Sequence, residues 1–406
     1  MAIVASGFSR KAPVSRKALA GAAIVATVVL GAQTWHKAFR PGGNDLTSYL
    51  LSARALWDGQ SPYGLDTPFP YLYPLFLAFV LGPLALLPYG AAVIGWFAAS
   101  VAALGLILRR WASGSELAIA AAVIVTFNII QNNLLNGQVN FFVVLCCVLA
   151  VASAGPPKGG HYVQKRREIQ AGGWLGAAIA LKLMPVLLVF YFLVRRQFRV
   201  ILVAGAAALL LALAPALLLD GPLGSVESGF SRIAGIYSQY VREFLAPMMT
   251  TPEASPVLAY SVASVVHRTL GVGPALWIDV LCAAAVLGTI AAVDVRTWRR
   301  RGDHLAAAGA YLVGIVLISP KSETHHLAFA IPAVALCSAS LVHEGFAFAG
   351  KRLAVVLIAA FAIVAAPFSG AAEGPMITAA MIFLIAAVAQ LPTSCIQRRS
   401  PAARTR

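Results

Sequence analysis

The sequence predicts an all-α integral membrane protein with about twelve membrane-spanning helices. Of its 406 residues, 60% are hydrophobic and only 11% are charged, whereas an ordinary soluble domain carries about 25% charged residues. Apolar runs recur along the whole chain, and a spanning helix needs about 20 mainly apolar residues. The segments between these runs are too short for a separate soluble domain. We therefore expect a single membrane domain over residues 1–406.

The first apolar run follows a basic segment that contains Arg10, Lys11, Arg16 and Lys17. Such a front resembles that of a signal peptide, but the many later runs favour an uncleaved first helix. Each of the later runs is interpreted as a further membrane crossing. The expected spans lie near residues 17–34, 71–88, 90–108, 117–133, 138–154, 171–193, 198–219, 274–293, 304–319, 325–341, 352–368 and 372–391.

Basic residues predict the orientation of these helices. The chain has 31 Lys and Arg against 15 Asp and Glu, an excess that in a soluble protein would suggest nucleic-acid binding. In a membrane protein, basic residues instead gather in cytoplasmic loops beside anionic lipid. An even number of crossings places both termini in the cytoplasm, together with the basic clusters at 195–199 and 296–301. We therefore expect a multi-pass protein of the cell (inner) membrane.

Two basic segments disagree with strict alternation. Arg109 and Arg110, and then the segment 158–167, come out on the external side. Either this charge has a role there, or one span between residues 71 and 193 is re-entrant or split.

Two segments outside the spans are long enough to matter, and both emerge on the external face. Segment 35–70 is rich in Gly, Pro, Asp and aromatic residues and contains a short helical stretch, Leu46 to Trp57. Segment 220–272 has an amphipathic pattern that suits a helix lying along the membrane interface. The apolar positions of that pattern are Phe230, Ile233, Ile236, Tyr237 and Tyr240.

Asp45 is the first candidate catalytic residue, because acidic groups are scarce and it follows the first span directly. A carboxylate at the membrane surface, one helical turn before Tyr49, could serve as a general base. It could equally cap a helix, since Asn44 and Asp45 precede an apolar periodic stretch. The sequence alone favours neither of these two interpretations.

A second polar group is the segment SPKSETHH at residues 319–326. Its paired histidines, His325 and His326, together with Lys321 and Glu323, could bind a phosphate or a metal at the end of a span. The alternative is an interfacial loop that is only polar. Adjacent histidines point in different directions on a helix, so we expect at most one of them to face a site.

Lys182 lies in the middle of an apolar run. A lysine at such a depth is costly unless it lines a polar cavity or reaches the interface, so we favour a functional role. The polar segment Gln131 to Asn140 likewise interrupts two spans. It could be only a turn, or Asn136, Gly137 and Gln138 could bind a polar head group. The five cysteines show no metal or disulfide spacing and are interpreted as packed helix residues, apart from Cys395 in the basic tail.

These residues together resemble a known family. The segment from Asp45 to Tyr63, with its sequence DLTSYLLSARALWDGQSPY, resembles the opening of glycosyltransferase family 87, the membrane mannosyltransferases that use polyprenyl phosphate mannose. Further landmarks follow in the same order. They are YLYP (71–74), NGQVN (136–140), LKLMP (181–185), YSVASVVHR (260–268) and SPKSETHH (319–326). The chain departs from the family at Leu75, where a second Pro is common, and at Glu323 and Thr324, where an aromatic is common.

The resemblance implies a GT-C fold, a multi-helix bundle with external loops over a cavity open to lipid. It implies a polyprenyl phosphate sugar as donor, with mannose as the expected sugar, and a lipid or glycan acceptor on the external face. By similarity, Asp45 is the base, the reaction inverts the anomeric centre, and the leaving phosphate needs positive charge or hydrogen-bond donors. No metal cluster is visible in the sequence, so we expect an enzyme that needs neither a metal nor a cofactor. His325 and His326 are expected to be catalytic together with Asp45. The residues expected to bind the substrates are Tyr49, Arg54, Tyr73, Asn136, Gln138, Lys182, Arg268 and Lys321.

Two other functions remain open at this point. A transporter or flippase of lipid-linked sugars would also need buried cations, although the sequence shows no inverted repeat of broken helices. A ligase that transfers a whole oligosaccharide is the nearer alternative. Nucleic acid is not an expected partner.

Overall fold

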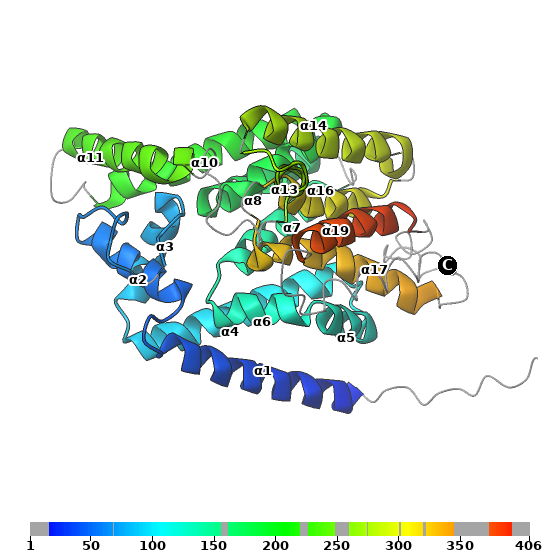
Figure 1. Cartoon of the computed structure of the whole chain (residues 1–406), viewed down its shortest axis with the longest axis horizontal. Helices are drawn as coiled ribbons and strands as arrows, with labels where there is room; N and C mark the ends of the chain where they lie inside the picture. The colour runs from blue at the N-terminus through cyan, green and yellow to red at the C-terminus, as the bar shows by residue number, and fades with distance from the viewer. Residues whose placement is uncertain are drawn as a thin grey trace, which may run out of the picture.

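The structure is a computed structural model. It describes residues 16–67, 69–155, 161–219, 226–247, 260–273, 275–299, 302–319, 322–344 and 373–391. Within these ranges every regular element is a helix (Figure 1). In Figure 1, α2, α3 and α11 gather at one end of the helical bundle, and the N-terminal end of α1 lies at the other.

Helices α1 (Arg16–Ala38) and α4 (Tyr89–Trp111) run antiparallel along one side of the bundle. A Cβ atom at Gly90 would lie 2.8 Å from the Trp35 ring, and one at Gly31 would lie 3.3 Å from the Phe97 ring. Thus the end of α1 meets the start of α4. It follows that the end of α4 lies near the start of α1.

Two short helices cover the end of the bundle where α1 finishes. They are α2 (Asp45–Trp57) and α3 (Leu75–Ala85), which pack against each other. The helical stretch expected from Leu46 to Trp57 is confirmed. The expected span at 71–88 is wrong as a single crossing, because α3 has only 11 residues. Tyr71 to Pro74 lie before α3 in irregular structure, and Pro74 is its N-cap. Within a longer helix that began before it, Pro74 would remove a backbone hydrogen bond and clash with the preceding turn.

The middle of the chain is made of bent and broken helices. α5 (Glu116–Val125) and α6 (Phe127–Leu135) form a pair bent by 71°. α7 (Asn140–Ser153) follows after a tight turn, and α8 (His161–Leu181) returns beside it. The run expected at 171–193 breaks after α8 into a 3₁₀ helix, η1 (Met184–Leu188), and α9 (Val189–Val194). Pro185 occupies the first turn of η1, where its missing N–H costs little.

The remaining helices complete the bundle. α10 (Phe198–Leu219) packs on α8, and α11 (Val226–Gln239) continues into the π-helical turn η2 (Tyr240–Leu245). On the expected apolar face Ile233, Ile236 and Tyr240 are buried and Tyr237 is half-buried, whereas Phe230 is exposed. The later elements are α13 (Val262–Leu270), α14 (Leu276–Val293), η4 (Asp294–Trp298), α16 (His304–Ile318), η5 (Thr324–Ala330), α17 (Ile331–Glu344) and α19 (Glu373–Ala389).

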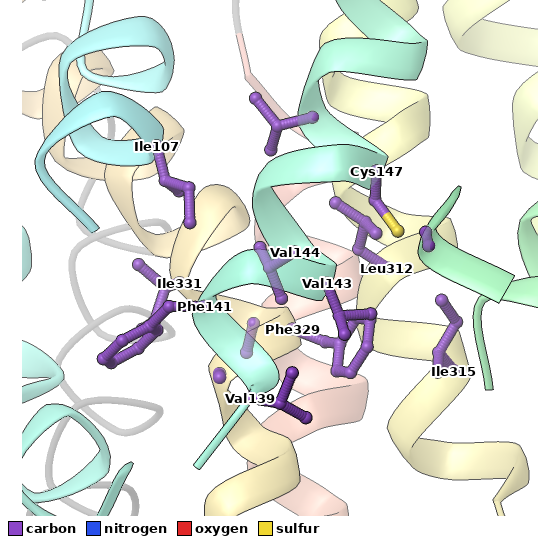
Figure 2. Packing of buried hydrophobic residues seen from close by; sticks show 14 of the residues in the cluster. Ile107, Val139, Phe141, Val143, Val144, Cys147, Leu312, Ile315, Phe329 and Ile331 are labelled. Atoms are coloured by element: carbon purple, nitrogen blue, oxygen red, sulfur yellow. The ribbon is translucent and has the colours of Figure 1, made fainter. Parts of the chain in front are cut away.

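The hydrophobic core is centred on α7 and α16. Figure 2 shows Ile107 of α4, Val143 and Cys147 of α7 and Leu312 of α16 in one cluster, and all four are buried. Cys147 and Cys337 are packed in helices as the sequence predicts, whereas Cys146 and Cys282 are half-buried and Cys395 lies outside the described residues. Because this core is apolar and closely packed, polar side chains that enter it need partners inside the protein.

Five helices in the described residues are long and apolar enough to cross a membrane, or six if α5 and α6 together form one bent span. The five lie at Ala18–Ala38, Tyr89–Trp111, Phe198–Ala216, Leu276–Thr297 and Thr324–Val342. Several other expected runs form apolar helices of 10–17 residues instead, and the run at 352–368 lies outside the described residues. Turns and prolines divide apolar runs that composition alone treats as continuous.

The fold bears on the two basic segments that disagree with strict alternation. Arg109 and Arg110 end α4, so they lie near the start of α1, at the opposite end from α2. Arg167 donates to the carbonyl of Ser153 at the far end of α7. α3 is too short to cross and α5 and α6 form a bent pair, which fits the second alternative expected from the sequence, a re-entrant or split span between residues 71 and 193.

Candidate functional site

The site begins at the first turn of α2. Asn44 caps this helix: its side chain accepts a hydrogen bond from the Thr47 N–H, and the Thr47 hydroxyl accepts from the Asn44 N–H. Asp45 is the first helical residue and its carboxylate is therefore not the cap. It remains half-buried beside the helix N-terminus, where a negative charge is favoured.

Gln138 holds the Asp45 carboxylate. Its amide nitrogen donates to Asp45 Oδ2 at 2.8 Å. Its amide oxygen accepts from the Tyr73 hydroxyl at 3.2 Å and lies 3.3 Å from the Tyr49 hydroxyl. The Tyr49 hydroxyl also donates to the Tyr73 hydroxyl at 2.8 Å. Three residues that the sequence predicts as substrate contacts are thus gathered around Asp45, and they bond to one another.

The turn that carries Gln138 is held by side chains that donate hydrogen bonds to its backbone carbonyls. Asn44 Nδ2 donates to the Leu135 carbonyl at 3.2 Å, and Trp96 Nε1 donates to the Gly137 carbonyl at 2.8 Å. Gly137 has φ of 65°, and a Cβ there would lie 2.7 Å from Leu46 Cβ. Only glycine meets both the backbone conformation and this close approach without strain.

Lys182 approaches the same network from the end of α8. It is 8% exposed, donates to Asn140 Oδ1 at 2.9 Å and lies 5.1 Å from the centre of the Tyr73 ring. A cation over an aromatic face is stabilised by the ring quadrupole. Lys182 thus has polar partners within the protein, and its functional role stays a prediction.

The paired histidines lie in the first turn of η5. The carbonyl of His325 accepts from Asn133 at 3.1 Å and from Asn140 at 3.0 Å. The His325 ring is 16% exposed, and its Nδ1 lies 3.5 Å from the Glu323 carboxylate. His326 is buried, and its Nδ1 accepts from the Glu323 N–H at 2.9 Å. A neutral His326 therefore carries its proton on Nε2.

Burial dominates the electrostatics of Asp45 and raises its pKa to about 6. The hydrogen bond from Gln138 and the positive charges of Lys37 and Lys182 oppose this rise. Burial also raises the pKa of Tyr49 well above its ordinary value. Near neutral pH the site thus holds an ionised carboxylate of moderate basicity beside protonated phenols, a combination suited to accepting a proton.

The other predicted residues lie further from this network. Arg54 is exposed on α2, nine residues after Asp45 and about 13 Å further along the helix axis. Arg268 lies in the last turn of α13, next to the pair of His267 and Asp279. Lys321 lies outside the described residues. Asn136 is adjacent to the site, where it accepts a hydrogen bond from Lys37.

Three residues of the site were not predicted from the sequence. Asn133 and Asn140 bond to each other at 3.0 Å and link Lys182 to the His325 backbone. Both interrupt apolar runs, and such polar residues in the core are the signal that could have found them. Lys37 was not singled out because it lies in the basic last turn of the first helix. Within the described residues, no group of three or more His, Cys, Asp or Glu side chains is arranged to hold a metal ion.

Comparison with known proteins agrees with the resemblance seen in the sequence. A search among curated proteins finds no match. One solved structure aligns with the fold: ArnT from Cupriavidus metallidurans, described as bound to undecaprenyl phosphate, with 16% sequence identity, a TM-score of 0.43, and coverage of 93% of this chain and 78% of that chain. The model of glycosyltransferase family 87 matches residues 71–320, well over half of the chain. The chain therefore belongs to glycosyltransferase family 87.

Proposed function

We propose that this membrane glycosyltransferase transfers a hexose, with mannose the first choice, from a polyprenyl phosphate sugar to a lipid or glycan acceptor on the external face. Asp45 acts as the general base. The observation that carries this proposal is that Asn44, and not Asp45, caps α2, while the Asp45 carboxylate accepts a hydrogen bond from Gln138. A carboxylate that the fold orients but does not use as a cap is available for chemistry.

The reaction balances in one displacement. The acceptor hydroxyl gives its proton to Asp45 as its oxygen forms a bond to C1 of the sugar. The bond from C1 to the phosphate oxygen breaks on the opposite face, its electron pair stays with the lipid phosphate, and the anomeric configuration inverts. In this proposal, Lys182 and one of the two histidines of η5 stabilise the charge that develops on the phosphate.

A lipid donor suits this location. The site lies where α2, the turn before α7, the end of α8 and the start of η5 meet, at or just inside one end of the helical bundle. A donor whose tail stays in the bilayer can present its phosphate there without leaving the membrane. Positive charge from Lys182 and Lys37 beside Asp45 supports an anionic substrate.

The test is a transfer assay in membranes that contain the protein and radiolabelled polyprenyl phosphate mannose. We expect a new labelled glycolipid or glycan with the wild type and at least a hundredfold less with Asp45→Asn. Wild-type turnover by Asp45→Asn would reject Asp45 as the base. If the label moved across the bilayer with no new glycosidic bond, a flippase would explain the result and the proposal would fail.

A further inference from the structure

Gln138 lies between the catalytic carboxylate and two buried tyrosines. It is 3% exposed, so its amide is enclosed by protein groups. The amide nitrogen faces Asp45, and the amide oxygen faces the hydroxyls of Tyr49 and Tyr73. A side chain so enclosed has little surface left with which to contact a sugar or a lipid head group.

The hydrogen bonds of this group run in one direction. Each phenol has one proton, and the Tyr49 hydroxyl donates to the Tyr73 oxygen, which lies closer to it, at 2.8 Å, than Gln138 Oε1 does, at 3.3 Å. The Tyr73 proton is then directed at Gln138 Oε1, at 3.2 Å. Turning the amide over would place its oxygen against the carboxylate and its NH₂ group against the phenols. The tyrosines therefore hold the amide with its donors toward Asp45.

We propose that Gln138 is a positioning residue for the general base, in place of the substrate contact expected from the sequence, and that Tyr49 and Tyr73 act through it by fixing its amide. The proposal rests on Asp45 being the base. By holding Oδ2, Gln138 fixes the carboxylate plane and leaves Oδ1 for the acceptor hydroxyl. Donors aligned in one chain also polarise one another, which strengthens the last bond.

Several charged and titratable groups face Asp45 from the surrounding elements. Lys37 approaches from α1 and Lys182 from the end of α8, and both favour the ionised carboxylate. The phenols of Tyr49 and Tyr73 stay protonated beside it. If Gln138 loses its donor, these groups remain, and only the direct hydrogen bond to Oδ2 disappears. Protonation of Asp45 then moves to higher pH.

The experiment compares the pH dependence of kcat/KM in wild type, Gln138→Met and Gln131→Met. Methionine keeps the length of glutamine and removes its donors. Gln131 is the matched control, because it lies on the neighbouring α6 and donates to Gln33 of α1, away from the hydrogen bonds around Asp45. We expect the acid limb of the Gln138→Met profile to move upward by about one pH unit, while Gln131→Met follows wild type.

An acid limb that stays in place in Gln138→Met would overturn the proposal, since a merely structural role lowers activity without moving that limb. Asp45→Asn in the same assay separates the two ideas. If it is inactive while Gln138→Met keeps the wild-type limb, the positioning role is wrong and the base stands. If it is active, the proposed base itself is wrong.

A second variant covers the case in which Gln138→Met does not fold. Tyr73→Phe keeps the ring beneath Lys182 and removes the closer of the two hydroxyls that contact Gln138 Oε1, leaving that of Tyr49 at 3.3 Å. We expect a shift of the acid limb in the same direction but smaller, because the amide stays and the Tyr49 hydroxyl can still donate to it. No shift in Tyr73→Phe would show that the Tyr73 phenol does not act through Gln138.

Discussion

At the scale of single residues, the site depends on which side chain performs the local structural work. Asn44 is the cap of α2, so Asp45 is spared for another role. In the same way, His326 accepts from the Glu323 backbone, whereas the His325 ring is the more exposed of the two. Neighbours in the sequence thus divide structure and chemistry between them.

The first prediction concerns the pH dependence of the wild-type enzyme. Because burial raises the pKa of Asp45 to about 6, kcat/KM should fall tenfold per pH unit below that value and level off above it. Measuring transfer from pH 5 to pH 8 checks this. An unchanged rate at pH 5 would exclude Asp45 as the ionised base.

The same pKa has a consequence for stability. Folding raises the pKa of this carboxyl from 3.8 to about 6, so the folded state binds more protons between these values. Stability contributed by this group is therefore lost as the pH rises through that window. We expect Asp45→Asn to melt at the same or a higher temperature than wild type at pH 7.5, and with no such advantage at pH 4. A clearly lower melting temperature at pH 7.5 would favour a structural role.

The histidines should respond differently to substitution. His325→Ala should lower turnover by about a hundredfold, the usual effect of removing one preorganised donor to a developing charge. His326→Asn should keep most activity, because its amide oxygen can stand near the position of Nδ1 and accept from the Glu323 N–H. Saturating-donor kinetics on both variants give the comparison. The reverse order of effects would assign His326 to the donor phosphate.

At the scale of elements, the site is built by short and broken helices. α2, the turn between α6 and α7, and the break after α8 all end at the same place. Each break lets a polar residue enter without interrupting a long helix in lipid. The turn before α7 is the most constrained of them, since Asn44, Trp96 and Lys37 all bond to it.

Gly137→Ala should disturb this turn. The new Cβ would lie 2.7 Å from Leu46 Cβ and would adopt a positive φ, which we expect to cost about 1–3 kcal/mol of stability. Moving Gln138 from Asp45 by about 1 Å should lower turnover by about a hundredfold. Thermal melting and the transfer assay measure the two effects.

Gly105→Ala is the matched control for this substitution. Gly105 lies inside α4, and a Cβ there meets nothing within 4 Å. Alanine should therefore be neutral or slightly stabilising at that position. If Gly137→Ala behaved like Gly105→Ala, the close approach of the turn to α2 would not matter for activity.

At the scale of the whole molecule, the two ends of the bundle differ in chemistry. Asp45, Gln138 and the aromatic residues around Tyr63 and Tyr240 lie at one end. At the other end, Arg195 pairs with the buried Asp294 at 2.7 Å. Arg109, Arg110 and Arg167 also lie away from α2, and on the positive-inside rule we propose that this second end faces the cytoplasm.

Cysteine labelling tests this orientation. In a background without the five native cysteines, Arg242→Cys should react with an impermeant thiol reagent in intact cells, and Arg296→Cys only after permeabilisation. Both arginines are exposed, on η2 and η4 respectively. The opposite labelling would place Asp45 on the cytoplasmic side and make a nucleotide sugar the expected donor.

The sequence by itself determined that this is an all-α membrane protein, because apolar length and scarce charge leave a helix in lipid as the solution. It also pointed to Asp45, Lys182 and the paired histidines, because charged residues beside or within apolar runs are costly and therefore conspicuous. It could not decide between base and cap at Asp45, since both need the same residue type before a helix.

Tertiary structure decided the rest. The number of crossings depends on where helices bend and break, and composition does not record the turn at Thr126 or the shortness of α3. The partnership of Gln138 with Asp45 joins residues 93 positions apart in the chain. No local pattern encodes such a contact, because it exists only when separate helices pack and bring their polar ends to one place.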